Sequence, residues 1–480
     1  MLNDLIANRR KKLEEYRKYA DPYPAKVKRT IRAAEAINNF QALLKSKKPV
    51  TVAGRTVSLR DQGKIVFGNI LDETGSIQVV CQKGVTKDFD ILKRALDIGD
   101  FIEVSGKVFK TKRGEKSILA SAARIIAKSL RPFPDAWYGL EDVETKLRER
   151  YLDLLTHGEV REIFRQKNIF WETIRGYMKD AGFLEVETPV LEFVPGGAEA
   201  EPFQTHHKAL DTDFYLRISL ELPLKKLLVG GYEKVFEIGR IFRNEGIDRE
   251  HLQDYTQMEC YWAYADYNDM MAFVRKMYFL VVKKLFGGYV TKIGGRKIKW
   301  NGVWPKVDYF SVFKHESGLD LARVSREDLR KKAFALGLTP EKSAGRGRLI
   351  DLIFKKTVRP KLVSPCFLVN PPVDVEPLAK RLFSDPDRVE RFQIVALGTE
   401  LGKGFTELND PVDQRARFEE QMKLREAGDK EAQRLDEDFL RALEYGMPPA
   451  AGFGMSERLF AVLMDRPVRE TVIFPLMRPK

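Results

Sequence analysis

The segment from residue 49 to residue 130 constrains the fold most, because its hydrophobic pattern changes from helical to alternating. Five short runs of alternating apolar and polar residues occur there, at 50–59, 64–71, 76–82, 101–110 and 116–126. A helical pattern at 86–96 falls between the third and the fourth run. Five strands with a helix after the third strand is the order of the OB-fold, a small barrel that commonly binds oligonucleotides. Residues 49–130 are therefore predicted to form a five-stranded OB-fold barrel.

Positive charge is concentrated at the start of the chain. The net charge is +14, of which residues 1–50 contribute +8 and residues 51–130 contribute +5. The pattern of residues 1–20 predicts an amphipathic helix with Arg9 and Lys12 on its polar side. We expect residues 1–48 to form a basic helical extension and the first 130 residues to bind a polyanion. Nucleic acid is favoured over a membrane surface, because this region contains no Trp to anchor a basic helix in the lipid interface.

The composition limits which cellular compartment and which class of protein the chain can belong to. The apolar fraction is 44% and the charged fraction 32%, as in ordinary globular proteins. Apolar runs are too short to span a bilayer, and the first residues lack the pattern of a secretory signal. Three cysteines lie far apart and form neither a disulfide framework nor a zinc motif. These features predict a cytoplasmic protein with no membrane partner.

The remaining residues, 131–480, read as one mixed region of helices and strands. A long helix is predicted at 159–181, apolar strands at 214–218, 235–241 and 255–263, and a further helix near 267–286. A basic, mostly helical stretch around 320–365 is interpreted as an insertion. The region is therefore expected to be an α+β domain.

Three short constellations in this region carry candidate chemistry, although the common glycine-rich phosphate motifs are absent. In the first, Arg243 and Glu245 at a strand end are expected on the same face because they are two residues apart, and the returning strand places Glu259 and Tyr261 on a common face. The group is either a structural ion-pair network or a pocket for a phosphate and a cationic group. In the second, alternation places Lys403, Phe405 and Glu407 on one side of a strand. In the third, Gly452 and Gly454 precede a helix that carries Arg458 near its start.

Taken together, these motifs resemble the class II lysyl-tRNA synthetases of bacterial type. The resemblance covers nearly the whole chain and includes the stretches 182–189 (class motif 1), 195–198, 205–207, 242–246 (motif 2) and 407–410. It implies an antiparallel catalytic sheet flanked by helices, the N-terminal OB-fold as the reader of the anticodon, and a homodimer. It also implies ATP-dependent ligation of L-lysine to tRNA(Lys) through a lysyl-adenylate, with Mg²⁺ as the cofactor.

The resemblance also assigns roles to individual residues. Arg243 would bind the α-phosphate and the lysine carboxylate, and Arg458 would clamp the nucleotide from its other side, so these two are the candidate catalytic residues. The other implied ATP contacts are Glu245 at the adenine amino group, Tyr255 on the ring, His251 at the outer phosphates and Glu400 at Mg²⁺. The implied lysine contacts are Gly196 and Glu221 at the α-amino group, Glu259, Tyr261 and Glu407 at the ε-ammonium, Phe405 on the aliphatic stem, and Lys403 at the carboxylate or a phosphate. The implied anticodon contacts are Arg60, Phe67 and Gln78, although alternation alone makes Phe67 a core residue.

Several positions depart from the family pattern. Gln393 stands where a second metal-binding Glu is usual, and Lys403 where an Asn is usual. Because an amide is a poorer Mg²⁺ ligand than a carboxylate, we hypothesise that this site binds ATP with fewer tightly held Mg²⁺ ions. In motif 2 Arg249 is displaced by one residue, motif 3 is one residue shorter than usual, and Ala122 replaces a usual Glu in the OB-fold.

Three alternatives compete with this interpretation. The aspartyl and asparaginyl enzymes share the OB-fold, but their pocket has an amide at the position of Glu221, and an acid there favours a cationic substrate. An inactive tRNA-binding paralogue is suggested by the departures above. An enzyme that modifies a protein lysine would typically lack the OB-fold, which this chain keeps.

Overall fold

The computed structural model describes residues 2–132, 142–246, 252–428 and 432–479. The chain forms two compact units, Met1–Glu141 and Asp142–Lys480. Within the described ranges, no helix has both the length and the apolar character needed to cross a membrane.

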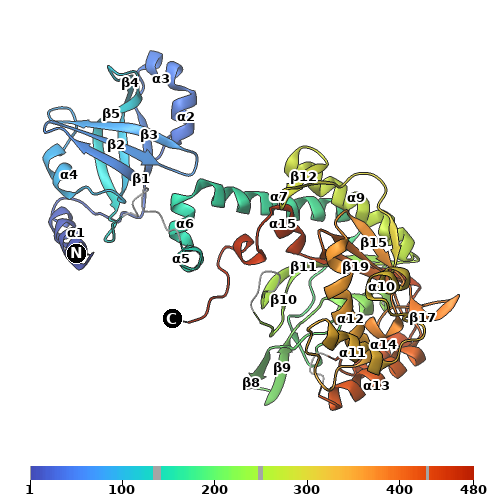
Figure 1. Cartoon of the computed structure of the whole chain (residues 1–480). Helices are drawn as coiled ribbons and strands as arrows, with labels where there is room; N and C mark the ends of the chain where they lie inside the picture. The colour runs from blue at the N-terminus through green and yellow to red at the C-terminus, as the bar shows by residue number, and fades with distance from the viewer. Residues whose placement is uncertain (1, 133–141, 247–251, 429–431, 480) are drawn as a thin grey trace. The chain divides into compact units, whose positions relative to one another are not determined.

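A closed barrel of five strands, in the order β1-β2-β3-β5-β4, forms the body of the first unit (Figure 1). Its elements are β1 (Val50–Asp61), β2 (Ile65–Leu71), β3 (Ser76–Gln82), α4 (Phe89–Ala95), β4 (Phe101–Lys110) and β5 (Lys116–Ala127). Every second residue of β2 is buried, so the inward side chains fill a common core. The OB-fold prediction is confirmed, with a helix after the third strand that is shorter than its sequence pattern.

Three helices precede the barrel: α1 (Leu2–Arg17), α2 (Ala33–Asn38) and α3 (Phe40–Ser46). In α1 the buried side chains are Leu13 and Tyr16, and the Tyr16 hydroxyl accepts a hydrogen bond from the backbone N–H of Ile125 at 3.1 Å. Leu2 and Leu5 are 45% and 48% exposed. The apolar face of α1 is thus confined to the C-terminal half of the helix.

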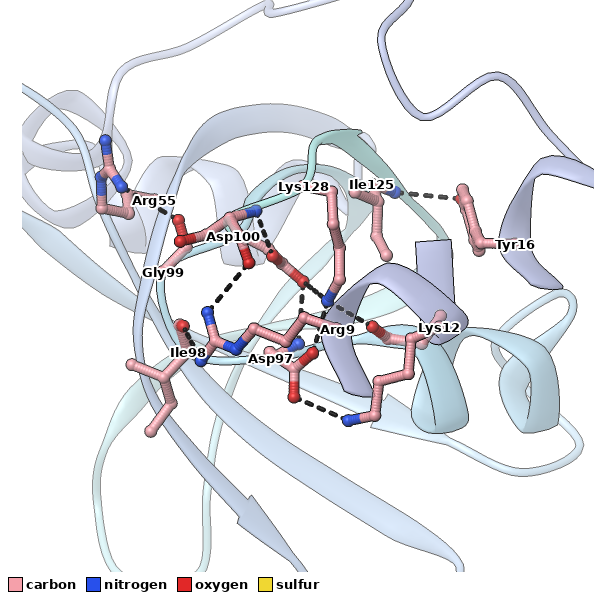
Figure 2. A network of polar contacts seen from close by, with 12 residues as sticks. Arg9, Lys12, Tyr16, Arg55, Asp97, Ile98, Gly99, Asp100, Ile125 and Lys128 are labelled. Carbon is pink, nitrogen blue, oxygen red and sulfur yellow. Dashed lines mark hydrogen bonds and ion pairs between the residues drawn. The ribbon is translucent and has the colours of Figure 1, made fainter. Parts of the chain in front are cut away.

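Charged side chains hold α1 on the barrel (Figure 2). The Lys128 ammonium is almost completely buried and contacts Asp97 at 2.5 Å and Asp100 at 2.7 Å. Lys12 of α1 contacts the other oxygen of Asp97 at 2.7 Å, and Arg9 donates to three backbone carbonyls of the barrel unit. Arg9 and Lys12 were expected on the polar side of the helix away from the core, and this prediction is wrong because Asp97 attracts Lys12 and backbone carbonyls accept from Arg9.

An eight-stranded sheet forms the centre of the second unit, in the order β14-β15-β18-β19-β20-β11-β10-β6 (Figure 1). The strands are β6 (Leu184–Glu185), β10 (Lys234–Phe242), β11 (Asp254–Ala263), β14 (Lys306–Asp308), β15 (Cys366–Val369), β18 (Arg391–Ala396), β19 (Thr399–Thr406) and β20 (Ala450–Ser456). The strands from β15 to β10 are antiparallel, as expected, and β14 and β6 add parallel edges that make the sheet mixed.

Helices cover the sheet on both faces. The core on one face packs α7 (Gly158–Asp180) and α9 (Tyr267–Phe286) against residues that include Cys260. The core on the other face includes Tyr261, the next residue of β11, and packs three further helices. These are α8 (Glu221–Val229), α13 (Pro411–Glu426) and α14 (Glu437–Glu444). Because side chains alternate along a strand, Glu259 and Tyr261 point to the face of α8, as the sequence predicted.

Smaller elements surround the sheet. The strand predicted at 214–218 is β9 (Thr212–Leu216), which belongs to a separate three-stranded sheet with β7 (Leu191–Glu192) and β8 (Gln204–His207). The helices α10 (Tyr309–Ser317), α11 (Arg326–Ala335) and α12 (Arg346–Thr357) share a core with β15. The remaining elements are β12 (Val290–Ile293), β13 (Arg296–Lys299), β16 (Arg381–Leu382), β17 (Asp385–Val389), α5 (Val143–Arg148), α6 (Arg150–Thr156), α15 (Arg458–Leu463) and three short 3₁₀ turns.

Candidate active site

Two neighbouring rows of residues across the sheet form the floor of a cavity of about 290 Å³. In one row Lys403 of β19 pairs with Gly454 of β20, which pairs with Glu259 of β11. In the next row Phe405, Gly452 and Tyr261 are paired in the same way. The middle strand contributes glycines to both rows, so the floor is deepest along β20 between side chains from β11 and β19.

Most of the residues singled out in the second unit line this one cavity. They are Glu221, Arg243, Tyr255, Glu259, Tyr261, Gln393, Glu400, Lys403, Phe405 and Arg458. Among the described residues, Gly196, Glu245 and Glu407 are not part of its lining, although Gly197 is. His251 lies outside the residues that the structure describes, as does Arg249. The sheet therefore brings together three constellations that span more than 200 residues of sequence, from Arg243 to Arg458.

The end of β10 separates Arg243 from Glu245. The strand ends at Phe242, and the N–H of Glu245 donates to the carbonyl of Arg243 at 2.9 Å, which turns the chain. The expectation that these two side chains share a strand face is therefore wrong. Arg243 lines the cavity, where its guanidinium lies 5.7 Å from the centre of the Tyr255 ring. Burial raises the pKa of the Tyr255 hydroxyl, so this ring stays neutral.

Glu259 connects β11 to the start of α8. Its Oε1 accepts from the hydroxyl of Ser219 at 2.7 Å, the backbone N–H of Leu220 at 2.9 Å and the amide of Gln257 at 2.6 Å. Its Oε2 accepts from the Tyr261 hydroxyl at 2.8 Å. These four donors fix the carboxyl group in the cavity wall and satisfy its buried oxygens.

Behind the cavity wall, a lysine of the chain itself meets two of the acids. Lys225 of α8 is completely buried and contacts Glu221 at 2.6 Å and the Oε2 of Glu407. Burial alone would lower the pKa of Lys225, but these two carboxylates outweigh it and raise the pKa. Burial raises the pKa of both Glu221 and Glu407, and the Lys225 ammonium opposes that rise. Sequence reasoning missed Lys225; its one signal is the spacing of four residues from Glu221 on a helix.

A second group of charges lies at the β18–β19 side of the cavity. Lys403 contacts the buried carboxylate of Glu376 at 3.0 Å, and Arg391 contacts the same oxygen at 3.3 Å. Burial alone would raise the pKa of Glu376, but Lys403 and Arg391 lower it. Glu376 was not singled out from the sequence, because it lies in an irregular segment far from the motifs.

The amide of Gln393 donates to Oε2 of Glu400 at 2.6 Å. Within the described ranges, no three Asp, Glu, His or Cys side chains are grouped so as to hold a metal ion. Mg²⁺ needs only one or two carboxylates when nucleotide phosphates and water complete its shell. The carboxylate of Glu400, with the amide of Gln393 bound to it, therefore fits a cation whose other ligands come from a nucleotide and water. It does not form a metal site whose ligands all come from the protein.

The candidate anticodon residues lie on the barrel of the first unit. Arg60 of β1 pairs with Phe67 of β2, and its guanidinium lies 4.9 Å from the centre of the Phe67 ring. Phe67 is partly exposed and lies outside the barrel core, so the expectation from alternation is wrong. Gln78 of β3 is half-buried and accepts from the Ser117 hydroxyl at 2.8 Å. A planar ring beside a guanidinium is a surface on which nucleic-acid bases stack.

A mainly antiparallel sheet with acids and arginines around one cavity, preceded in the chain by an OB-fold barrel, is the architecture of class II aminoacyl-tRNA synthetases. The family model of class II tRNA synthetases (D, K and N) matches residues 142–478, and that of the OB-fold nucleic acid binding domain matches residues 50–126.

Full-length relatives narrow the family further. The chain is 43% identical to a lysine–tRNA ligase of Pelotomaculum thermopropionicum, covering 100% of this chain and 96% of the relative. It is 44% identical to the lysine–tRNA ligases of Carboxydothermus hydrogenoformans and Moorella thermoacetica, covering 100% of this chain and 99% and 98% of the relatives. The chain belongs to the lysine–tRNA ligase family of class II tRNA synthetases.

Proposed function

We propose that this chain ligates L-lysine to tRNA(Lys) in two steps through a lysyl-adenylate. The observation that carries this proposal is the distribution of charge around one cavity. The acids Glu221 and Glu259 line it together with the arginines Arg243 and Arg458. Acids complement the ammonium groups of lysine, and arginines complement a carboxylate and the phosphates of ATP.

In the first step the lysine carboxylate attacks the α-phosphorus of ATP, and pyrophosphate leaves. Arg243 holds the α-phosphate and the attacking carboxylate together, and Arg458 holds the nucleotide from its other side. Their charges stabilise the negative charge that builds up on the phosphate oxygens, so catalysis rests on positioning and electrostatics. Glu245 contacts the adenine amino group, Tyr255 stacks on the ring and His251 approaches the outer phosphates.

Lysine is selected by the acidic part of the cavity. Gly196 and Glu221 receive the α-amino group, whereas Glu259, Tyr261 and Glu407 receive the ε-ammonium. Phe405 packs on the aliphatic stem of the substrate. A neutral side chain would leave buried carboxylates unpaired, which is a strong penalty against the wrong amino acid.

In the second step the terminal ribose hydroxyl of the tRNA attacks the lysyl carbonyl, and AMP leaves. Residues 49–130 bind the anticodon through Arg60, Phe67 and Gln78, and the basic extension 1–48 precedes them in the sequence. Residues 131–480 form the domain that catalyses both steps, and they include the insertion around 320–365. The active form is a homodimer in the cytoplasm.

Magnesium enters with the nucleotide. Mg²⁺ bound through Glu400 and phosphate oxygens would neutralise charge on the triphosphate. Gln393 supplies an amide where a second carboxylate would bind a further ion, and Lys403 supplies a fixed positive charge three residues from Glu400. The site therefore needs fewer tightly held Mg²⁺ ions than a site with two glutamates.

The test is ATP–pyrophosphate exchange with lysine, aspartate or asparagine, followed by charging of tRNA. Exchange with lysine alone is expected, and its dependence on free Mg²⁺ should be shallower than that of a relative with two glutamates. Absence of exchange at every Mg²⁺ concentration would favour an inactive tRNA-binding protein. Exchange with aspartate or asparagine would overturn the choice of substrate.

A further inference from the structure

The buried ion pairs of Lys225 change the balance of charge in the amino-acid pocket. Glu221, Glu259 and Glu407 are all at least nine-tenths buried. Three carboxylates would exceed the two ammonium groups that a free lysine molecule brings. The Lys225 ammonium, which contacts two of the three acids, reduces their combined charge to two.

The contacts of Glu407 show which atom remains for a ligand. Its Oε2 contacts Lys225, whereas its Oε1 has no hydrogen-bond partner among the described residues and is fully shielded from solvent. A Cβ built on Gly452 would collide with this Oε1 and with the Tyr261 ring. Gly452 and Tyr261 both line the cavity. The unpaired oxygen therefore lies against Gly452 and Tyr261, two residues of the cavity lining.

Lys225 is held rigidly. It extends from the middle of α8, its side chain is 0% exposed, and its ammonium lies 5.3 Å from the Phe405 ring centre and 5.9 Å from that of Phe439. Leaving this position would give up the contacts with both rings and leave two buried acids unpaired, which is costly. The ammonium thus acts as a fixed counterion and does not compete with a ligand for Oε1.

We propose that Lys225 is a specificity-determining positioning residue, whose fixed ammonium contacts Glu221 and Glu407 and orients Glu407 to receive the ε-ammonium of lysine. This inference rests on the proposed function, because it takes lysine as the ligand of the pocket. Lys225 acts through Glu407 and does not touch the substrate.

The proposal predicts a specific failure when Lys225 is replaced. The charged and titratable groups that face Glu407 are Glu221 and Lys225 from α8, Tyr261 from β11, and Glu376. In Lys225→Met the ammonium that opposes the effect of burial on Glu407 is gone, so the pKa of Glu407 rises further and the protonated carboxyl group is favoured. A protonated carboxyl attracts an ammonium weakly and tolerates a neutral side chain. As the pH rises through the raised pKa, the carboxylate returns and lysine binding recovers.

The experiment measures binding by calorimetry on the full chain, with lysine and with norleucine, whose side chain has the same four carbons and lacks the ε-ammonium. For Lys225→Met we expect lysine affinity to fall on the order of 100-fold near neutral pH, the loss expected for breaking a buried ion pair. Norleucine affinity should not fall, and the lysine affinity should recover with rising pH more steeply than in the wild type. Lys226→Met is the matched control, since it removes the neighbouring lysine of the same helix, whose partner is the exposed Asp438.

Equal losses for lysine and norleucine at every pH would overturn the proposal, because a merely structural defect affects both ligands alike. If Lys225→Met does not fold, Lys225→Gln keeps N–H donors without the charge and should give the same pattern. Normal discrimination by a folded Lys225→Gln would also overturn it. Binding of lysine by the wild type without any ATP–pyrophosphate exchange would contradict the proposed function and leave this test of Lys225 intact.

Discussion

Each unit of this molecule buries one lysine between two carboxylates, and the two clusters differ in how completely they are satisfied. In the first unit Lys128 bridges Asp97 and Asp100 and also donates to the backbone carbonyl of Ala95 at 2.6 Å. The other oxygens of these acids accept from Lys12 and from the backbone N–H of Ser129 (Figure 2). In the second unit Lys225 bridges Glu221 and Glu407, and Oε1 of Glu407 has neither a hydrogen-bond partner nor an ion pair within the described ranges.

This difference separates a structural cluster from a binding cluster. A buried polar group that lacks a partner costs free energy, so it persists where a ligand supplies the partner. The Lys128 cluster is closed and joins α1 to the barrel. The Lys225 cluster has an open acceptor beside a cavity. A buried lysine by itself therefore does not distinguish a structural cluster from a binding cluster, whereas the number of acceptors around it that have partners does.

The largest effect is expected from Lys128→Met. Removing this ammonium leaves Asp97 and Asp100 buried without their main counterion, which should destabilise the first unit by about 3–5 kcal/mol. Hydrogen–deuterium exchange of β4 and β5 should rise, whereas exchange in the sheet of the second unit should stay unchanged. Lys12→Met is the control, because its side chain is 27% exposed and its loss should cost about 1 kcal/mol or less. Equal effects of the two variants would contradict a closed, buried cluster.

A large effect on lysine binding is expected from Gly452→Ala. The added Cβ would lie 2.5 Å from a carbon of the Tyr261 ring and would collide with Oε1 of Glu407. Overpacking of this kind costs about 1–3 kcal/mol, so the lysine KM should rise on the order of 10- to 100-fold with little change in the ATP KM. Gly454→Ala, two residues along β20, is the matched control.

At Gly454 the nearest atom to an added Cβ is Cγ of Glu259, at an ordinary contact distance of 3.4 Å. We therefore expect a clearly smaller rise of the lysine KM in Gly454→Ala, measured by ATP–pyrophosphate exchange. If both variants raise it equally, the open oxygen of Glu407 is not the feature that matters for lysine.

How much of this could be predicted from the sequence depends on whether a feature is local. The barrel was predictable because alternation in β1 to β5 and the helix between the third and fourth strands are local patterns. Glu259 and Tyr261 were correctly placed on one face because two residues in one strand are related by a fixed geometry. Arg243 and Glu245 were not, because the strand ends at Phe242 and a turn follows it, so the fixed geometry of a strand does not apply to them.

Contacts between distant segments were not predictable from the residues alone. Lys225 and Glu407 are separated by 182 residues, and Lys403 meets Glu376 across an irregular segment. In the first unit, the charges of Arg9 and Lys12 looked like solvent-facing charges of an amphipathic helix, and their partners lie about 90 to 120 residues away. An ion pair becomes visible only when the fold brings both partners together, so sequence located the acids of the site and missed their counterion.

The smallest of these effects is expected from Phe67→Ala, which tests whether the outer surface of the barrel in the first unit binds tRNA. The Phe67 ring is partly exposed beside Arg60, and a base stacked on such a ring contributes about 1–3 kcal/mol. The tRNA KM in charging should therefore rise roughly tenfold, since 1.4 kcal/mol corresponds to a factor of ten. ATP–pyrophosphate exchange should not change, because it requires no tRNA.

Phe101→Ala is the matched control: the Phe101 ring centre lies 4.3 Å from the Arg55 guanidinium on the same barrel, but Phe101 was not assigned to the anticodon surface. A similar rise in both variants would mean that the barrel as a whole was weakened, and an unchanged tRNA KM in Phe67→Ala would place the anticodon contacts elsewhere on the first unit.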